Sequence, residues 1–386
     1  MKLEGIRVID LSQFLPGPHL TMMMADHGAE VIKVENTAEG EPTRNIGYRK
    51  GGQSVYFRNT QRGKKSLTLN LKSDQGREVL CKLAETADVL LESFRPGVVD
   101  KLGVGYEALR KRAPGLIYCS ISAFGQQSRH RERPAHDLSV QALAGTLSLS
   151  ASESGAPVLP NLPGADALGS LMALSGILMA LLRRQQSGQG DFLDISMFDA
   201  LISWTCNTTG PVFAEGRAPV LREERTLGGT AFYQIYRSKD GGHVTLGGSE
   251  PKFVKNLLSA LGREDLIETA TQPPGPGQKP VVDFLKETFA SKTRDEWAAW
   301  FEGKDVCFGP VRDLREVYDD PFLTEREMLL HDQEGLEHIG IPIKFREEPG
   351  QVNFHAPEHG EHARELLRGL GYGDAEIEAM KGQGVW

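Results

Sequence analysis

The first 125 residues alternate between short apolar runs and longer segments with apolar residues at helical spacing. The short runs are rich in β-branched residues, which is typical of buried strands. The pattern predicts helices at 19–27 and 74–87 and strands at 6–11, 30–35, 66–71, 89–91 and 116–121. Strands that alternate with helices indicate a mostly parallel α/β sheet. Ligands bind such sheets at loops beyond the strand carboxyl ends, here 15–18, 92–97 and 122–126.

The pattern changes after about residue 210. Residues 215–229 are rich in charge, Gly and Pro and resemble a linker. Two strand-like runs, 232–236 and 243–246, then flank a turn at 239–242, which predicts a hairpin. A loop is expected at 271–279 and helices at 252–261, 283–290 and 293–301. These elements predict a second, α+β domain.

One carboxylate lies at the start of an apolar helix. Asp166 precedes a long run of Ala, Leu, Gly and Met. A carboxylate there faces the unpaired N–H groups and the positive end of the helix dipole, which favour an ionised group. Beside a thioester it could act as a nucleophile. A helix N-cap is the alternative role, because Asp is among the preferred capping residues.

The apolar run itself, 168–182, is interrupted by Gly and Ser. We expect it to be too short to span a bilayer and to form a buried core helix.

Composition narrows the functional classes. The chain has 386 residues, of which 39% are hydrophobic and 25% charged, as in a soluble globular enzyme of two domains. A net charge of -8 argues against general nucleic-acid binding. Four widely spaced cysteines and no secretory start predict a reduced, cytoplasmic location without membrane attachment.

Several common site motifs are absent from the sequence. The first strand-to-helix turn has no G-x-G-x-x-G, which argues against NAD or FAD, and there is no G-x-S-x-G or P-loop. His355, His359 and His362 suggest a metal, but no cysteine lies near them and the segment is charged. We therefore expect no metal.

The chain resembles the family III CoA-transferases, the superfamily of formyl-CoA transferase, carnitine CoA-transferase and α-methylacyl-CoA racemase. The resemblance covers nearly the whole length, and it rests on the order of several short segments: 3–10, 17–18, 28–35, 63–72, 95–97, 191–197 and 358–362.

The resemblance implies a Rossmann-like large domain and a small α+β domain, in a ring-like chain that forms an interlocked homodimer. We assign the large, CoA-binding domain to 1–210, a linker to 211–228 and the small domain to 229–315. Residues 316–386 form a second linker and a return to the large domain.

The resemblance also implies catalytic residues. Asp166 matches the aspartate that attacks the thioester in the transferases. His136, in the step His136-Asp137-Leu138, matches a racemase base, for which imidazole suits because it titrates near working pH. Glu250 matches a racemase position that supports the histidine. The alternatives are a capping pair at His136 and a surface glutamate at Glu250.

Family positions for coenzyme A fall in the first loop and after later strands. Lysines can meet CoA phosphates as point charges, although a solvated surface charge is the alternative for each. The implied CoA-binding residues are Phe14, Leu15, Leu69, Lys72, Phe94, Arg95 and Lys101.

Departures from the family pattern bear on the reaction. Leu15 stands where the transferases keep an active-site glutamine, and Asn36 replaces a common arginine. The glycine loop of formyl-CoA transferase is much shorter here, at Gly247 and Gly248, while the spacing from Asp166 to Gly176 fits transferases better than racemases. We therefore predict a CoA-transferase that uses an acyl-CoA and a carboxylic acid. The alternatives are a racemase-type epimerase and a non-catalytic acyl-CoA-binding protein.

Overall fold

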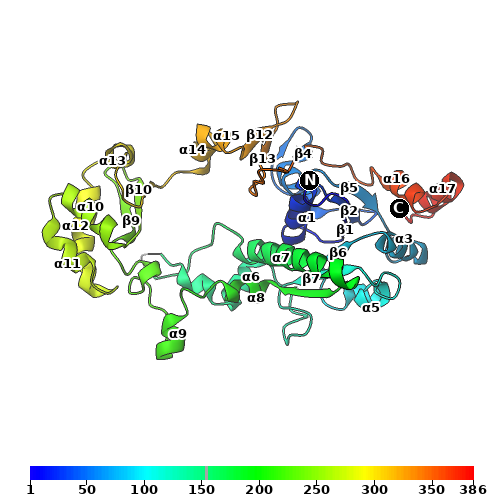
Figure 1. Ribbon diagram of the computed structural model, residues 1–386, viewed down its shortest axis with the longest axis horizontal. Coiled ribbons are helices and arrows are strands. Elements are labelled where there is room, and N and C mark those ends of the chain that lie inside the picture. Colours follow the sequence, from blue (N-terminus) through cyan, green and yellow to red (C-terminus); the bar gives the residue numbers. More distant parts are fainter. Residues whose placement is uncertain (153–154) are drawn as a thin grey trace. The chain divides into compact units, whose positions relative to one another are not determined.

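The computed structural model describes residues 1–152 and 155–386. Contacts within the chain divide it into two compact units (Figure 1). The first holds Met1–Ala144, Leu159–Ser203 and Pro321–Trp386, and the second holds Gly145–Val158 and Trp204–Asp320. Residues 145–158, which the sequence placed in the large domain, therefore group with the second unit.

The first unit is built on a parallel sheet. Its described strands run in the order β5-β2-β1-β6-β7-β8, and every neighbouring pair is parallel. This is the doubly wound order of Rossmann folds, in which the chain direction across the sheet reverses between the first and fourth strands, here β1 and β6. The expected mixed α/β fold with a parallel sheet is confirmed. The strands are β1 (Arg7–Asp10), β2 (Glu30–Glu35), β5 (Lys65–Thr68), β6 (Val89–Glu92), β7 (Ile117–Ser122) and β8 (Phe192–Ser196).

Helices cover both faces of this sheet, and each face has its own apolar core. On one face, α1 (Pro16–Asp26) and α7 (Gly164–Ser187) pack through Leu20, Ala173 and Ile177. On the other, α3 (Asp74–Glu85) packs with α16 (Ala363–Gly369) and α17 (Asp374–Gly382). The C-terminal helices thus return to the first unit, and Figure 1 shows them beside α3. The unit also contains β3 (Arg49–Lys50), β4 (Gln53–Ser54), α2 (Val55–Gln61), α4 (Val98–Lys101), α5 (Tyr106–Leu109), α6 (Asp137–Leu143), α8 (Met197–Ser203), α15 (Pro321–Glu325), β12 (Leu329–His331) and β13 (Glu337–Ile339).

Helix α7 is longer than the sequence suggested. Its 24 residues make it long and apolar enough to cross a membrane by length and composition alone, so the expectation that it is too short is wrong. Only 39% of its most apolar stretch is buried. The inner side packs closely, because a Cβ at Gly176 would lie 2.5 Å from the Leu193 side chain. The outer side leaves Leu171, Met179 and Leu182 exposed.

The second unit is a small α+β structure. Its sheet has the order β11-β10-β9 and is antiparallel, with the predicted hairpin formed by β9 (Tyr233–Arg237) and β10 (His243–Gly247). Trp297 and Phe289 fill its core. The remaining elements are α9 (Gly210–Glu215), α10 (Pro251–Ala260), α11 (Ile267–Ala270), α12 (Lys279–Phe289), α13 (Arg294–Phe301), β11 (Phe308–Pro310) and α14 (Leu314–Tyr318).

Candidate active site

A cavity of about 490 Å³ opens in the first unit at the carboxyl ends of β1, β6 and β7. It therefore lies at the point where the strand order reverses, which is where open α/β sheets bind ligands. Its walls come from the loops after these strands, from the segment before α6 and from the start of α7. The lining residues are Gln13, Phe14, Pro16, Ser93, Phe94, Arg95, Pro96, Val98, Ile121, Ser122, Ala123, Arg131, Arg133, Pro134, Ala135, His136, Asp166 and Met197.

Two aspartates lie at the start of α7, and only one of them caps the helix. Asp166 is the third residue of the helix, whose N-cap is Pro163, so the N-cap alternative for Asp166 is wrong. Asp137 caps the helix instead: its Oδ1 accepts hydrogen bonds from the backbone N–H groups of Ala165 (2.7 Å) and Asp166 (3.2 Å). Gln141 donates to the other oxygen of Asp137 at 2.7 Å. These hydrogen bonds hold Asp137 in place. The carboxyl of Asp166 is therefore not needed to cap the helix.

The pKa of Asp166 is raised from 3.8 to about 7, first by burial and then by the negative charge of Asp137. Burial disfavours the ionised form, and the neighbouring carboxylate adds repulsion. A carboxyl that titrates near neutral pH can accept or release a proton there. The structure thus supplies a group suited to acid–base or nucleophilic work.

His136 is the second candidate catalytic residue that lines the cavity. It is the N-cap residue of α6, yet its side chain makes no capping hydrogen bond. The imidazole is exposed and stands edge-on to the Phe14 ring, with ring centroids 5.7 Å apart. The structure therefore brings His136 and Asp166 to one cavity, although 29 residues separate them in the chain.

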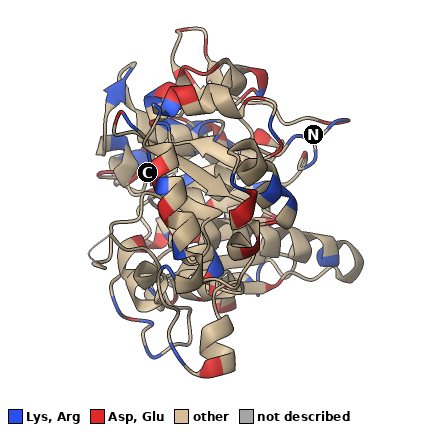
Figure 2. Ribbon diagram, turned by 90° about the vertical axis from the view of Figure 1, so that its left-hand side faces the viewer, with Lys and Arg blue, Asp and Glu red and all other residues tan. Residues whose placement is uncertain are grey.

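Three arginines give the cavity a positive rim. Arg95, Arg131 and Arg133 line it, and all three are exposed. Their guanidinium groups suit phosphate oxygens, which arginine binds with paired hydrogen bonds. Figure 2 shows acidic and basic residues interspersed along the ribbon. Only Arg95 was predicted from the sequence. The segment 129–133, just before His136, contains three arginines and is the sequence signal for the other two.

The predicted CoA-binding residues fall into three groups. Phe14, Phe94 and Arg95 line the cavity, and Leu15 adjoins it as the N-cap residue of α1. Leu69 is buried in the core on the other face of the sheet. Lys72 and Lys101 are exposed and lie outside the cavity lining.

Glu250, the third predicted catalytic residue, belongs to the second unit. It is the N-cap residue of α10 and makes no capping hydrogen bond. A Cβ on Gly248 would lie 3.0 Å from the Glu250 carboxylate and 2.7 Å from the Cys307 sulfur, so the three residues are neighbours.

Tyr56, on α2, is a residue that the sequence analysis missed. Its pKa is raised to about 12 by burial and by the charges of Asp166 and Glu41. The hydroxyl therefore stays protonated near neutral pH and can donate a hydrogen bond. No motif marked it, because a tyrosine in a short helix carries no sequence signal for a site.

The loops that follow β1 and β6 are joined by hydrogen bonds to each other and to the sheet. The Gln13 N–H donates to the Ser93 hydroxyl at 3.0 Å, and the Phe94 N–H donates to the Glu92 carboxyl at 2.7 Å. Burial raises the pKa of Glu92 to about 7. Gly17 allows the start of α1 to lie close to the loop after β1, since a Cβ there would meet the Ser12 hydroxyl at 2.1 Å.

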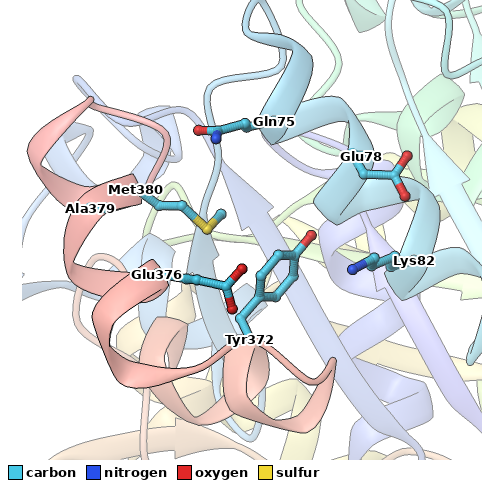
Figure 3. Close-up of a pocket in the computed structure, with 7 residues that line it drawn as sticks. All are labelled: Gln75, Glu78, Lys82, Tyr372, Glu376, Ala379 and Met380. Carbon is cyan, nitrogen blue, oxygen red and sulfur yellow. The ribbon is translucent and has the colours of Figure 1, made fainter.

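Two further cavities lack the predicted residues of the first unit's site. One, of about 360 Å³, lies between α3 and α17, where the Lys82 ammonium is 4.2 Å from the centre of the Tyr372 ring (Figure 3). The other, of about 950 Å³, is a groove of the second unit. No acidic residue lines it within the described chain, whereas Arg222 and His243 do.

The three histidines considered for a metal contact other protein groups, and Glu361 lies near both His355 and His362. His355 pairs with Glu361 at 2.9 Å, and the ring of His359 is 2.8 Å from the carbonyl oxygen of Asn36. The Nδ1 of His362 accepts from the Ser66 N–H at 3.2 Å. Among residues 1–152 and 155–386, no group of three potential ligands is arranged to hold a metal ion.

Comparisons with known proteins show the family of this chain. The model of CoA-transferase family III matches residues 3–363. This chain is 35% identical to the alpha-methylacyl-CoA racemase of Mus musculus, over 98% of this chain and 95% of that protein. It is 32% identical to the succinyl-CoA:mesaconate CoA-transferase of Haloarcula hispanica, over 98% of this chain and 99% of that protein. The structure of a CAIB/BAIF family protein from Brucella suis matches with a TM-score of 0.81 and 29% identity, covering 95% of this chain and 99% of that one.

Proposed function

Because this chain belongs to CoA-transferase family III, we propose that it moves CoA between an acyl-CoA thioester and a carboxylic acid. One observation carries the proposal: Asp166, partly buried, shares a cavity at the sheet's reversal point with three arginines. The arginines suit the phosphates of CoA, and Asp166 is then available to the thioester at the other end of the ligand.

In this proposal Asp166 splits the transfer into steps that each exchange one acyl bond. Its carboxylate attacks the thioester carbon, the CoA thiolate leaves, and a mixed anhydride forms. The thiolate then attacks the Asp166 carbonyl and releases the first acid, which leaves an aspartyl-CoA thioester. The acceptor carboxylate attacks that thioester, and the returning thiolate attacks the acceptor's acyl carbon, which frees Asp166.

The raised pKa of Asp166 sets a condition on this chemistry. Only the ionised carboxylate is a nucleophile, and with a pKa of about 7 roughly half of the molecules carry it at neutral pH. We therefore expect transfer to speed up as the pH rises through about 7.

A racemase-type epimerase is the second candidate, and His136 favours it. The His136 imidazole and the Asp166 carboxyl line one cavity, so two groups that can act as bases face a common space. Two such bases could remove and return the proton on the α-carbon of a thioester. The 35% identity to a racemase supports this candidate as well.

Incubation with a 2-methylacyl-CoA in deuterated water, with and without an acceptor acid, separates the two. CoA exchange that requires an acceptor supports the transferase. Deuterium at the α-carbon without any acceptor supports the epimerase. Hydroxylamine trapping with peptide mass analysis adds a direct test, because an aspartyl thioester marks the Asp166 peptide. An unmodified peptide together with rapid deuterium uptake would overturn the first choice.

We also propose that the protein acts as a homodimer. The apolar outer side of α7 supports this, since Leu171, Met179 and Leu182 are 45%, 67% and 66% exposed. Contiguous apolar surface of this kind marks interaction sites. Sedimentation should give twice the monomer mass, and Met179→Asp should weaken association. A folded, active monomer at low concentration would contradict the proposal.

A further inference from the structure

The loop between β1 and α1 holds Phe14 in a conformation that residues with a Cβ rarely adopt. Its φ is +64°, in the left-handed region where the side chain crowds the following carbonyl. This backbone conformation directs the ring into the cavity, edge-on to His136 at 5.7 Å. Because phenylalanine disfavours this region, neighbouring groups have to hold the loop there.

The buried ion pair of Glu41 and Lys33 forms hydrogen bonds with the backbone on both sides of Gln13. One oxygen of Glu41 accepts the Phe14 N–H at 3.0 Å. The other lies 3.0 Å from the ammonium of Lys33, which also donates to the Ser12 carbonyl oxygen. Glu41 is 1% exposed and Lys33 is 2% exposed, so water cannot replace these contacts. We call this arrangement of Lys33 and Glu41 the loop clamp.

The loop clamp is itself held rigidly. Thr43 donates two hydrogen bonds to Oε1 of Glu41, the oxygen that also accepts the Phe14 N–H. One comes from the Thr43 N–H at 3.3 Å and one from its hydroxyl at 3.1 Å. Glu35 accepts the Glu41 N–H at 2.8 Å. A buried ion pair is seldom more stabilising than an apolar pair of the same size, so its use here favours a role in fixing geometry.

We propose that Glu41 and Lys33 are positioning residues that hold Phe14 against His136 and so orient the imidazole for chemistry at the thioester. Neither side chain lines the cavity, and both act through Phe14. The inference rests on the proposed thioester chemistry for its functional part. Its structural part, the dependence of the Phe14–His136 contact on Glu41, stands on the hydrogen bonds alone.

The structural part is tested by ¹³C-histidine NMR of the full chain. The His136 ring signal is assigned by its loss in His136→Gln, and Phe14→Leu shows where it moves without the aromatic ring. Glu41→Gln should move it toward the Phe14→Leu position. Asp26→Asn is the matched control, because it also neutralises a buried, ion-paired carboxylate, and it should leave the signal in place. An unmoved His136 signal in Glu41→Gln overturns the loop clamp.

The functional part is tested by turnover of the same variants with acyl-CoA. Glu41→Gln should lower kcat about tenfold, the size expected for a lost hydrogen bond to a charged group, with a smaller change in KM. In the Phe14→Leu background the same change should have less than about a twofold effect, since Glu41 acts through Phe14. Full additivity would refute the positioning role.

Two design features keep these outcomes distinguishable. If Glu41→Gln does not fold, the double variant Glu41→Gln/Lys33→Met replaces it in both experiments. It removes both charges of the pair, and Asp10, which lies 3.7 Å from Lys33, keeps Lys64 as its ion-pair partner at 3.0 Å. If the wild-type protein turns over no acyl-CoA at all, the proposed function fails, whereas the NMR result still decides whether the loop clamp positions Phe14.

Discussion

Replacing Asp166 with asparagine should stabilise the fold, and the gain should grow with pH. The folded protein holds this carboxyl partly buried and near the charge of Asp137, which raises its pKa from 3.8 to about 7. Asparagine has nearly the same shape and no charge to desolvate or repel. The substitution thus removes the unfavourable charge and leaves the packing at the start of α7 in place.

The sign and size follow from proton linkage. Between about pH 4 and 7 the folded protein binds a proton at Asp166 that the unfolded chain has lost, so the wild-type protein loses stability as the pH rises through this window. A shift of about three pH units corresponds to at most about 4 kcal/mol. The difference between variant and wild type should be small near pH 4, about 1.5 kcal/mol at pH 5 and largest above pH 7.

Urea unfolding at pH 5, 6, 7 and 8, at one protein concentration, measures this difference. Asp199→Asn is the control: Asp199 is an exposed aspartate in the first turn of α8, so its variant shows the effect of the same substitution outside the cavity lining. The Asp166→Asn variant should also be inactive. A stability difference that is flat in pH, or that favours the wild type at pH 8, would refute the reasoning about burial and Asp137.

Three other outcomes follow from the contacts described. Arg62→Met should lower the free energy of unfolding by about 3–5 kcal/mol in urea, because it leaves the carboxylate of Asp26 buried without its partner. Arg133→Ala should weaken CoA binding several-fold in calorimetry, with a smaller loss at high salt, because salt screens an exposed charge. Asp137→Asn should shift the midpoint of the pH–rate profile below about 7, since it removes the like charge beside Asp166.

The sheet could be predicted because its strands are buried on both faces. The run at 30–35 matches β2 (Glu30–Glu35), and the other predicted strands of the sheet differ from the observed ones by a few residues at most. The sixth strand, β8 (Phe192–Ser196), was not predicted as a strand. It is an edge strand with only Ser196 buried, so its sequence lacks a continuous apolar run. Its Asp194 accepts the Gln126 N–H at 2.9 Å instead of packing in a core.

The sequence indicated candidate residues for the site, but it could not indicate how the fold brings them together. Asp166 and His136 were identified through a family pattern, and their approach to one cavity depends on how α6 and α7 pack. Sequence spacing gives no information on that packing. Arg131 and Arg133 were missed for the same reason, since a basic run in a loop resembles a solvated surface until its fold is known.

The sequence suggested that a carboxylate caps α7, and the structure has such a carboxylate at a different residue from the one considered. A carboxylate does cap α7, but it is Asp137, 28 residues upstream of the N–H that it binds most closely. With the helix start already satisfied, the Asp166 carboxyl is released from that role and lies partly buried beside a like charge. The same residue that stabilises the helix thereby raises the pKa of its neighbour. Asp137 thus both caps the start of α7 and contributes to the raised pKa of Asp166, which is why Asp137→Asn should affect the stability of the helix start and the pKa of Asp166.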